Sequence, residues 1–567
     1  MDGESWIKHI DQWERFLRLQ ISSAEDEGMK TKAFRQLKSI EMVRYSAVLN
    51  PAVLTSFISP PPTIHTDYHI PNFYLSLNDS QKRAVEAALD ENCITLIQGP
   101  PGTGKTQVIT EICLQMYKRN PNVRILVCSE THVAVNNLIS RIASIDPSIR
   151  ILRIRDKEQD ELIDEYSPKT IIENYIKWIG ATYSSRDLLS IFSEALSDTE
   201  NPTLEKALAL SSNIVGMTCN RVGAYDFEST SEMFDMVIID EVCKATLPEI
   251  LMPLAIAQKA VLVGDPKQLP PVFCSEEIDI IKKIEECKLQ KYMYIDELFS
   301  GGNNVCTLDT QYRMADEIGN LISELFYDNV LQNGRNAVIK DSIQWVDYEP
   351  EMPWPVYHEE DGEKQKIYNL DECSIVSQIL LQLDSQPESN ISSVAVISPY
   401  KAQVFKIREC VRKMQLRQLK VDVDTVDGFQ GKECDCVLFS LTRTTGTFRF
   451  LADQRRLNVA LLDRRFQLSK DIFEVLTCGC DSDNLGMCVL FLVTLLFFDN
   501  IAHRIQESVI LEVVFIQVGG ILIRKKRIGL DGKLLAVQIL VGDIVRNVRC
   551  RARSHRHGYC DDKNEHQ

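Results

Sequence analysis

The sequence predicts an α/β protein with two tandem domains, each built on a parallel sheet, and three observations support this prediction. Short, apolar, β-branched segments alternate with longer helical segments, as in sheets that are buried on both faces. One apolar segment runs directly into a glycine-rich turn and then a helical pattern. The alternation occurs in two blocks, at about 76–300 and 301–465, which indicates two similar domains with a cleft between them.

The segment before the first block is predicted to be helical. Apolar residues recur near helical spacing from Trp6 to Leu17, and helical character extends over about 1–50. A proline-rich break at Ser59–Pro62 and an irregular stretch follow. Residues 1–75 are therefore expected to form a helical segment and a linker.

The first block contains five predicted strands, each short and rich in β-branched residues. A charged, helical stretch at about 153–212 interrupts them and is predicted to be an inserted subdomain. The strands are Ile94–Gln98, Arg124–Ser129, Ile214–Thr218, Met236–Ile239 and Ala260–Val263.

The second block contains four predicted strands, and the character of the sequence changes after about residue 465. Residues 466–567 are predicted to form a divergent region with a disordered tail at 551–567. Its apolar stretch Leu485–Phe498 is short for a bilayer span, so a core strand or helix is preferred to a membrane segment. The basic cluster Arg524–Arg527 is interpreted as a solvated face. The strands are Val305–Leu308, Val394–Ser398, Val421–Asp424 and Cys436–Leu441.

Composition limits the possible partners and compartments. The net charge of −17 provides no global attraction to nucleic acid, although a local basic groove, backbone amides and stacking can still bind it. The 17 cysteines are odd in number and scattered, which is typical of thiols in a reducing compartment. No signal peptide is recognisable, so a cytoplasmic or nuclear protein without membrane attachment is expected.

The segment Leu96–Thr106 predicts a buried strand followed by a phosphate loop of the pattern G-x-x-x-x-G-K-T. Backbone amides of such a loop face the phosphates, Lys105 would reach the outer phosphates, and Thr106 would bind Mg²⁺. The helix from about Lys105 to Tyr117 adds the positive end of its dipole. The predicted nucleotide-binding residues are Gly99, Pro100, Pro101, Gly102, Thr103, Gly104, Lys105 and Thr106.

Two acidic residues end the predicted strand at 236–239, where the ligand crevice of an α/β sheet lies. Asp240 is predicted to hold Mg²⁺ directly or through water. Glu241 is predicted to orient or deprotonate the attacking water. Gln268 follows the next strand in a tight turn and is predicted to sense the γ-phosphate, the alternative being an ordinary surface turn.

Six motifs occur in order: GPPGTGKT, DEVCKATLPE, VGDPKQLPP, LDTQYRM, TVDGFQGKECD and RRLNVAL. In these motifs, over about 75–462, the chain resembles the superfamily 1 helicases, in particular the group of the nonsense-mediated-decay RNA helicase, senataxin and the immunoglobulin mu-binding helicase. The resemblance implies two RecA-like P-loop domains that use ATP and Mg²⁺. It also implies an ATP-dependent RNA or DNA helicase or translocase, moving 5′→3′ on single-stranded nucleic acid, with RNA favoured over DNA.

The resemblance also implies roles for individual residues. Gln81 would read the adenine edge, Tyr312 would stack on the base, and Arg313 would act as an arginine finger. Gly431 would approach the nucleotide, and Glu433 the ribose hydroxyl. The segments implied to contact nucleic acid are Cys128–Asn137, Met217–Cys219, Ser398–Tyr400 and Ser440–Arg443.

The chain departs from the family pattern at several points. Lys244 stands where the family usually has a glutamine that links ATP to the nucleic-acid site, and Asp463, within Leu462–Arg465, replaces a second arginine finger. The family's closing strand and helix are not recognisable, and the small barrel before the first motor domain is absent or reduced. Because of Asp463 and the altered end, the alternative function is an ATP-binding nucleic-acid clamp or scaffold with impaired hydrolysis. A P-loop kinase or transporter ATPase fits the phosphate loop but not the later motifs.

Overall fold

The computed structural model describes a large part of the chain, and the statements below concern that part. The described residues are 3–45, 48–64, 66–155, 165–182, 202–224, 234–284, 294–300, 304–334, 346, 356–361, 364–385, 391–429, 434–442, 455–456, 458, 511–515 and 524–528. Contacts divide the chain into two compact units, 1–472 and 473–567.

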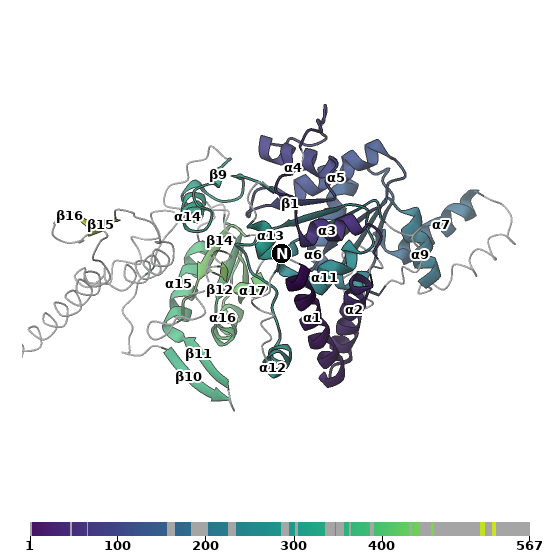
Figure 1. Ribbon diagram of the computed structural model, residues 1–567. Helices are drawn as coiled ribbons and strands as arrows, with labels where there is room; N and C mark the ends of the chain where they lie inside the picture. Colours follow the sequence, from purple (N-terminus) through teal and green to yellow (C-terminus); the bar gives the residue numbers. More distant parts are fainter. Residues whose placement is uncertain are drawn as a thin grey trace, which may run out of the picture. The chain divides into compact units, whose positions relative to one another are not determined.

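A seven-stranded sheet forms the centre of the first unit (Figure 1), and every neighbouring pair in it is parallel. The order is β3-β4-β2-β5-β6-β1-β7. Parallel strands end at one edge, so the segments after them share the ligand-binding side of the sheet. The strands are β1 (Ile94–Gln98), β2 (Ile125–Ser129), β3 (Ile151–Arg153), β4 (Ile214–Thr218), β5 (Met236–Asp240), β6 (Ala260–Gly264) and β7 (Val305–Thr307).

The five strands predicted in the first block are confirmed to within one residue at each end. The prediction for Val305–Leu308 was wrong in one respect. This segment does not begin the second sheet, because β7 pairs with β1 through Leu96 and Val305 at the edge of the first sheet. The residue pattern indicates a strand but carries no information about which sheet edge that strand joins.

The sheet is buried on both faces because its strands are apolar at successive positions. In β1, Leu96 belongs to one core and Ile97 to the other. In β5, Val237 and Ile238 alternate in the same way. Successive strand residues point to opposite faces, so a run of branched apolar residues supplies two cores at once.

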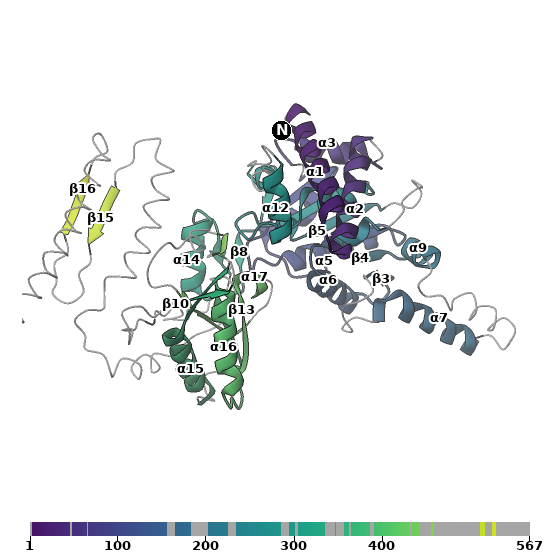
Figure 2. The same cartoon turned by 90° about the horizontal axis from the view of Figure 1, so that it is seen from below.

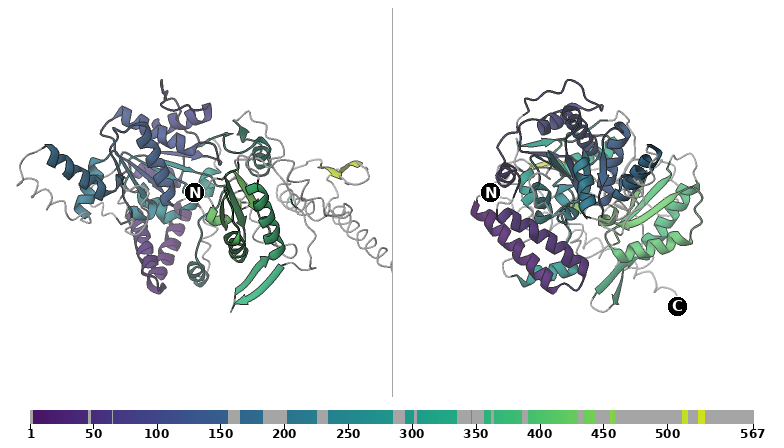
Figure 3. Two further views of the ribbon diagram at one scale, coloured as in Figure 1. Left: turned by 180° about the vertical axis from the view of Figure 1, so that it is seen from behind. Right: turned by 90° about the vertical axis from the view of Figure 1, so that its right-hand side faces the viewer.

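Different sets of helices cover the two faces (Figure 1). One core includes residues of α4 (Asp79–Leu89), α5 (Lys105–Arg119) and α6 (His132–Ile145). The other lies under the N-terminal helices, which confirms the predicted helical character of residues 1–50. Helices α1 and α2 form an antiparallel pair, seen in purple in Figure 3. The helices on this side are α1 (Gly3–Ser23), α2 (Glu27–Arg44), α3 (Pro51–Ile58), α10 (Cys219–Val222), α11 (Leu247–Leu254), α12 (Ser275–Lys283) and α13 (Tyr294–Phe299).

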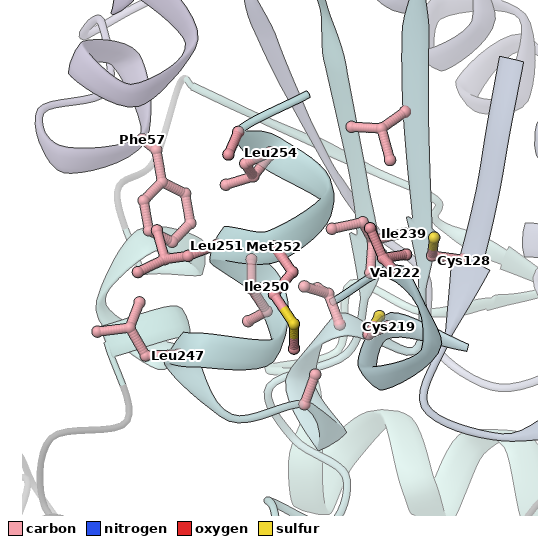
Figure 4. Close-up of a cluster of buried hydrophobic side chains, with 14 of the residues drawn as sticks. Phe57, Cys128, Cys219, Val222, Ile239, Leu247, Ile250, Leu251, Met252 and Leu254 are labelled. Atoms are coloured by element: carbon pink, nitrogen blue, oxygen red, sulfur yellow. The ribbon is translucent and has the colours of Figure 1, made fainter. Parts of the chain in front are cut away.

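Helix α11 joins the N-terminal helices to the sheet. Figure 4 shows its side chains between Phe57 of α3 and the sheet residues Cys128 and Ile239. Because α11 follows β5 after the short 3-10 helix η3 (Val242–Lys244), this packing connects the N-terminal helices to the end of β5.

Helices occupy the predicted insertion between β3 and β4. They are α7 (Pro168–Thr182) and α9 (Pro202–Ser211), and Figure 2 shows α7 projecting beside β3 at the edge of the sheet. Arg153, the first residue of the predicted insertion, belongs to β3.

A second parallel sheet has the order β13-β12-β14. The last three strands predicted in the second block are therefore confirmed. Helices α15 and α16 contact each other beside this sheet (Figure 2). The elements of this part are β8 (Thr310–Gln311), α14 (Asp316–Phe326), β9 (Gln332–Asn333), β10 (Val356–Asp361), β11 (Lys364–Asn369), α15 (Leu370–Ser385), β12 (Ser393–Ser398), α16 (Lys401–Lys413), β13 (Lys420–Thr425), α17 (Val426–Phe429) and β14 (Cys436–Phe439).

The described part of the second unit is an antiparallel strand pair, β15 (Leu511–Phe515) with β16 (Arg524–Ile528), and the basic cluster Arg524–Arg527 lies on β16. The predictions for Leu485–Phe498 and for the tail 551–567 fall outside the described residues. Among the helices that the structure describes, none is long and apolar enough to cross a bilayer.

Candidate functional site

The phosphate loop connects β1 to α5, and two of its glycines have positive φ. Gly102 has φ 74° and Gly104 has φ 81°, a region that side-chain-bearing residues rarely adopt. The Lys105 ammonium donates a hydrogen bond to the Gly99 carbonyl at 2.9 Å. A Cβ atom on Gly99 would lie 2.3 Å from Lys105 Cγ, so only glycine allows the loop to wrap around this side chain. Residues Gly99 to Thr106 thus form one continuous turn into the start of α5.

The acidic pair lies at the end of β5. Asp240 is the last residue of the strand, and its Oδ1 accepts a hydrogen bond from the Glu241 backbone N–H at 2.9 Å. Glu241 has φ 53°, which is uncommon for a residue with a side chain. This conformation ends the strand and turns the chain into η3.

Two ammonium groups face the Glu241 carboxylate. Lys105 Nζ lies 3.7 Å from Oε1, and Lys244 Nζ lies 3.5 Å from Oε2. The first pair connects the phosphate loop to the end of β5. The second pair forms within one turn, because η3 brings Lys244 back over Glu241.

Burial and nearby charges shift the pKa values of Asp240 and Glu241 in opposite directions. Burial raises the pKa of Asp240, and the neighbouring Glu241 charge adds to the effect. Burial also acts to raise the pKa of Glu241, but Lys244 and Lys105 outweigh it and hold this pKa below its usual range. At neutral pH, Glu241 is therefore an ionised carboxylate.

The residues predicted to bind Mg²⁺ fit a hard divalent cation. Thr106 supplies a hydroxyl in the first turn of α5, and Asp240 supplies a carboxylate that is 6% exposed. Mg²⁺ prefers oxygen ligands and keeps several waters, so two protein oxygens near a phosphate site are sufficient. A cation would also offset the cost of ionising the buried Asp240.

Gln268 lies in a buried hydrogen-bond network rather than in an ordinary surface turn. Its amide donates to Asp265 Oδ2 at 2.9 Å, and the Tyr327 hydroxyl donates to the same oxygen at 2.6 Å. The Asn458 amide donates to the Tyr327 hydroxyl at 3.0 Å and to the Lys267 carbonyl at 2.8 Å. The network links the turn after β6 to the end of α14 and to the RRLNVAL motif.

The QYRM motif lies directly against the phosphate loop. The Tyr312 backbone N–H donates to the Gly102 carbonyl at 2.9 Å, and the Asn78 amide donates to the Tyr312 hydroxyl at 2.9 Å. A Cβ atom on Gly102 would lie 2.7 Å from Arg313 Cβ. The positive charge of Arg313 also lowers the pKa of Glu241. Both residues implied to contact the nucleotide from this motif therefore lie at the loop.

Gln81 supports the loop from the other side. It is 1% exposed, and its amide nitrogen donates to the Thr103 carbonyl at 2.9 Å. Its amide oxygen accepts from the Asn78 N–H at 2.9 Å as part of the capping box of α4. The adenine-reading role stays a prediction, and these contacts add a structural role.

The segments implied to contact nucleic acid follow the C-terminal ends of parallel strands. Cys128–Asn137 leads from β2 into α6, and Met217–Cys219 ends β4, the neighbour of β2. Ser398–Tyr400 follows β12, and the described part of Ser440–Arg443 follows its neighbour β14. Each pair therefore lies at one edge of its sheet.

Hydroxyl groups in the two implied contact segments after the second sheet are buried. Ser398 and Thr442 are both 0% exposed, and their hydroxyl oxygens lie 2.9 Å apart. The Ser440 hydroxyl donates to Glu372 Oε2 at 2.5 Å. These side chains stabilise the loops internally, whereas Tyr400 is partly exposed.

Several contacts of the site had no sequence signal. Asp265 and Tyr327 are 62 positions apart, and nothing in the local pattern marks the tyrosine. Lys244 was recognised as a departure from the family, but its ion pair with Glu241 was not predicted. The predictions for Gly431, Glu433 and Leu462–Arg465 fall outside the described residues.

Comparison with known proteins agrees with the family resemblance. Two family models, both described as AAA domain, match residues 76–183 with 185–276 and residues 290–468. DNA polymerase alpha-associated DNA helicase A of Saccharomyces cerevisiae is 32% identical over 448 residues, 69% of this chain and 64% of that protein. ATP-dependent helicase NAM7 of the same yeast is 31% identical over 461 residues, 76% of this chain and 45% of that protein. Helicase sen1 of Schizosaccharomyces pombe is 27% identical, over 69% of this chain and 29% of that protein. The chain spans less than two thirds of the length of each of these three relatives.

Proposed function

Because this chain belongs to the superfamily 1 helicases, we propose that it is an ATP-dependent motor that moves along single-stranded nucleic acid and separates paired strands. The observation that carries the proposal is the group of residues around the phosphate loop. Lys105 and Glu241 lie 3.7 Å apart, and the QYRM segment contacts the loop through Tyr312 and Gly102. ATP bound there would contact both sheet domains.

The chemistry is phosphoryl transfer to water. Lys105 would leave Glu241 and the Gly99 carbonyl to neutralise the outer phosphates. Glu241 would then orient the attacking water and accept its proton. Arg313 would stabilise the charge that develops on the γ-phosphate, and Gln268, fixed by Asp265, would contact that phosphate from the turn after β6.

We propose Mg²⁺ as the accompanying metal. Thr106 and Asp240 would hold it, and the ion would neutralise the phosphate oxygens. The burial of the Asp240 carboxyl group supports this proposal, because a cation beside it would offset the cost of keeping the group ionised away from water.

The proposed substrate is a single strand, with RNA before DNA, and the proposed direction is 5′→3′. The segments after β2, β4, β12 and β14 would hold the strand mainly through its backbone. Such binding is independent of sequence and is compatible with a net charge of −17, since local groups make the contacts. A motor of this kind would act in the cytoplasm or the nucleus.

Steady-state ATPase assays with and without single-stranded RNA or DNA test the proposal. We expect hydrolysis that requires Mg²⁺ and increases when a strand is added. Hydrolysis that no strand stimulates would contradict a nucleic-acid motor. The Glu241→Gln variant, assayed in parallel, shows whether contaminating enzymes contribute to the signal.

One observation favours the alternative of a clamp with weak hydrolysis. Lys244 lies 3.5 Å from Glu241 and occupies an oxygen that a catalytic base needs. A clamp would bind ATP and a strand but hydrolyse ATP slowly under all conditions. The strand-stimulated rate therefore separates the two functions.

A further inference from the structure

We propose that Lys244 is a positioning residue that acts as a latch: it holds the Glu241 carboxylate until a bound strand draws the ammonium group away. This inference rests on the proposed function and names how the strand would control hydrolysis. Two features carry it: the pairing of both Glu241 oxygens, and the group formed by Glu130, Glu249 and Lys32.

Each oxygen of Glu241 has its own ammonium group. Lys105 faces Oε1 at 3.7 Å, and Lys244 faces Oε2 at 3.5 Å. The side chains are shielded, with exposed fractions of 13%, 17% and 22% for Lys105, Lys244 and Glu241. Solvent therefore screens these ion pairs less than it would screen pairs at an open surface.

ATP alone would release only one of the two oxygens. The phosphates attract Lys105, because this lysine belongs to the phosphate loop. Lys244 belongs to η3, where its backbone N–H donates to the Glu241 carbonyl at 2.9 Å, and it would stay on Oε2. The carboxylate would remain paired and poorly placed to receive a proton from water.

Glu130 is a second acidic residue on which the Lys244 charge acts. It follows β2 within the segment implied to contact nucleic acid. Burial, with Glu249 nearby, raises the pKa of Glu130 to about 8. Glu130 is therefore mostly neutral at pH 7 and competes weakly with Glu241 for Lys244.

A bound nucleic-acid strand would change the competition for the Lys244 ammonium group. Its phosphates are fully ionised and would lie along the segment that contains Glu130. They would attract the Lys244 ammonium away from Glu241 and free the second oxygen. Binding of the nucleic-acid strand would thus change the environment of Glu241 through the Lys244 side chain.

A lysine of the N-terminal helices interacts with Glu130 and Glu249, near the segment implied to contact nucleic acid. Lys32 of α2 lies 2.8 Å from Glu249 and 3.9 Å from Glu130. Glu249 also accepts a hydrogen bond from the Gln36 amide at 2.9 Å. Lys32 is thereby held on Glu249, whereas Lys244 is paired with Glu241 and would be drawn toward a bound nucleic-acid strand.

The test compares three variants with the parent chain by steady-state ATPase with and without single-stranded RNA. Lys244→Gln removes the ammonium group, and Lys244→Arg keeps a positive charge. Lys282→Gln is the matched control, since Lys282 forms an exposed ion pair with Asp279 at the same i,i+3 spacing.

We expect Lys244→Gln to raise the strand-free kcat about fivefold, the effect of losing one partly screened ion pair. The ratio of stimulated to strand-free kcat should fall by a similar factor, while Lys244→Arg and Lys282→Gln keep the parental ratio. A Lys244→Gln variant with an unchanged ratio, or with both rates lowered in proportion, would overturn the latch while a stimulated parent chain still supports the motor. A parent chain that no strand stimulates would refute both.

Discussion

Glu241 combines an unusual backbone conformation with the position of a catalytic base. Its φ of 53° places it between a buried strand and a 3-10 turn, and two lysines face its oxygens. Strained residues of this kind persist where the surrounding structure fixes them, often at functional sites. The paired carboxylate is ionised, as a base must be before it accepts a proton.

Glu241→Gln is expected to retain ATP binding and to lose turnover by a factor of about 10²–10⁴, the usual contribution of a general base. The amide keeps the size and hydrogen-bonding shape of the side chain but cannot accept the proton. Nucleotide binding is measured by fluorescence titration and turnover by phosphate release, with exposed Glu276→Gln as control. Wild-type turnover in Glu241→Gln would exclude Glu241 as the base.

Gly102 tests the contact between the phosphate loop and the QYRM motif. Its φ is 74°, and a Cβ added to it would lie 2.7 Å from Arg313 Cβ, so both backbone and space require glycine. Gly102→Ala and Gly102→Asn should both lower kcat/KM for ATP by at least about tenfold, since displacing the segment by even about 1 Å is costly. Asparagine tolerates positive φ better than alanine. A fully active asparagine variant would therefore show that only the backbone conformation matters.

Among the elements, one buried polar network connects the turn after β6 to the end of α14 and to the RRLNVAL motif. Asp265 follows β6, Tyr327 follows α14, and Asn458 belongs to the RRLNVAL motif. All three side chains are buried, and their hydrogen bonds form one chain that ends at Gln268. Burial raises the pKa of Asp265, so its donors compensate for lost water.

Tyr327→Phe should lower the free energy of unfolding by about 1–2 kcal/mol, because it removes a hydrogen bond to a buried carboxyl group without opening a cavity. Urea denaturation followed by circular dichroism measures the change. Tyr45→Phe removes a hydroxyl from a side chain that is 76% exposed and should be neutral. Equal stability of the two variants would mean that the Tyr327 hydroxyl does not stabilise the fold.

For the whole molecule, the partly buried acidic group Glu130 makes the free energy of unfolding depend on pH. Its pKa is about 8 in the folded chain, through burial and Glu249, despite the opposing charges of Lys32 and Lys244. The folded chain thus favours the protonated form of the Glu130 carboxyl group. The associated stability is fully present below the ordinary pKa of a glutamic acid and is lost as pH rises through about 8.

Glu130→Gln should therefore flatten the stability profile between pH 6 and pH 9. We expect the wild-type free energy of unfolding to fall by on the order of 1–2 kcal/mol more than that of the variant across this range. Urea denaturation at several pH values measures both curves. Parallel curves would show that Glu130 is ionised throughout.

The sequence predicts those features whose signals are local. A strand, a glycine loop and a helix start are encoded within a dozen residues, so β1, the loop and α5 were predictable from Leu96–Thr106. The sheet partner of β7 was not, because its pairing with β1 depends on the whole fold. The contact between Asn458 and Lys267 spans 191 positions, and no spacing rule marks it. The Lys244–Glu241 pair is local, yet its geometry depends on the positive φ of Glu241, which the sequence does not reveal.

Displacement of streptavidin from biotinylated single-stranded RNA tests the central claim most directly, because it detects movement driven by ATP. We expect ATP- and Mg²⁺-dependent displacement from the 3′ end, which reports 5′→3′ motion, and none by Glu241→Gln. Strand-stimulated hydrolysis without displacement from either end would contradict a motor, and displacement from the 5′ end alone would reverse the proposed direction.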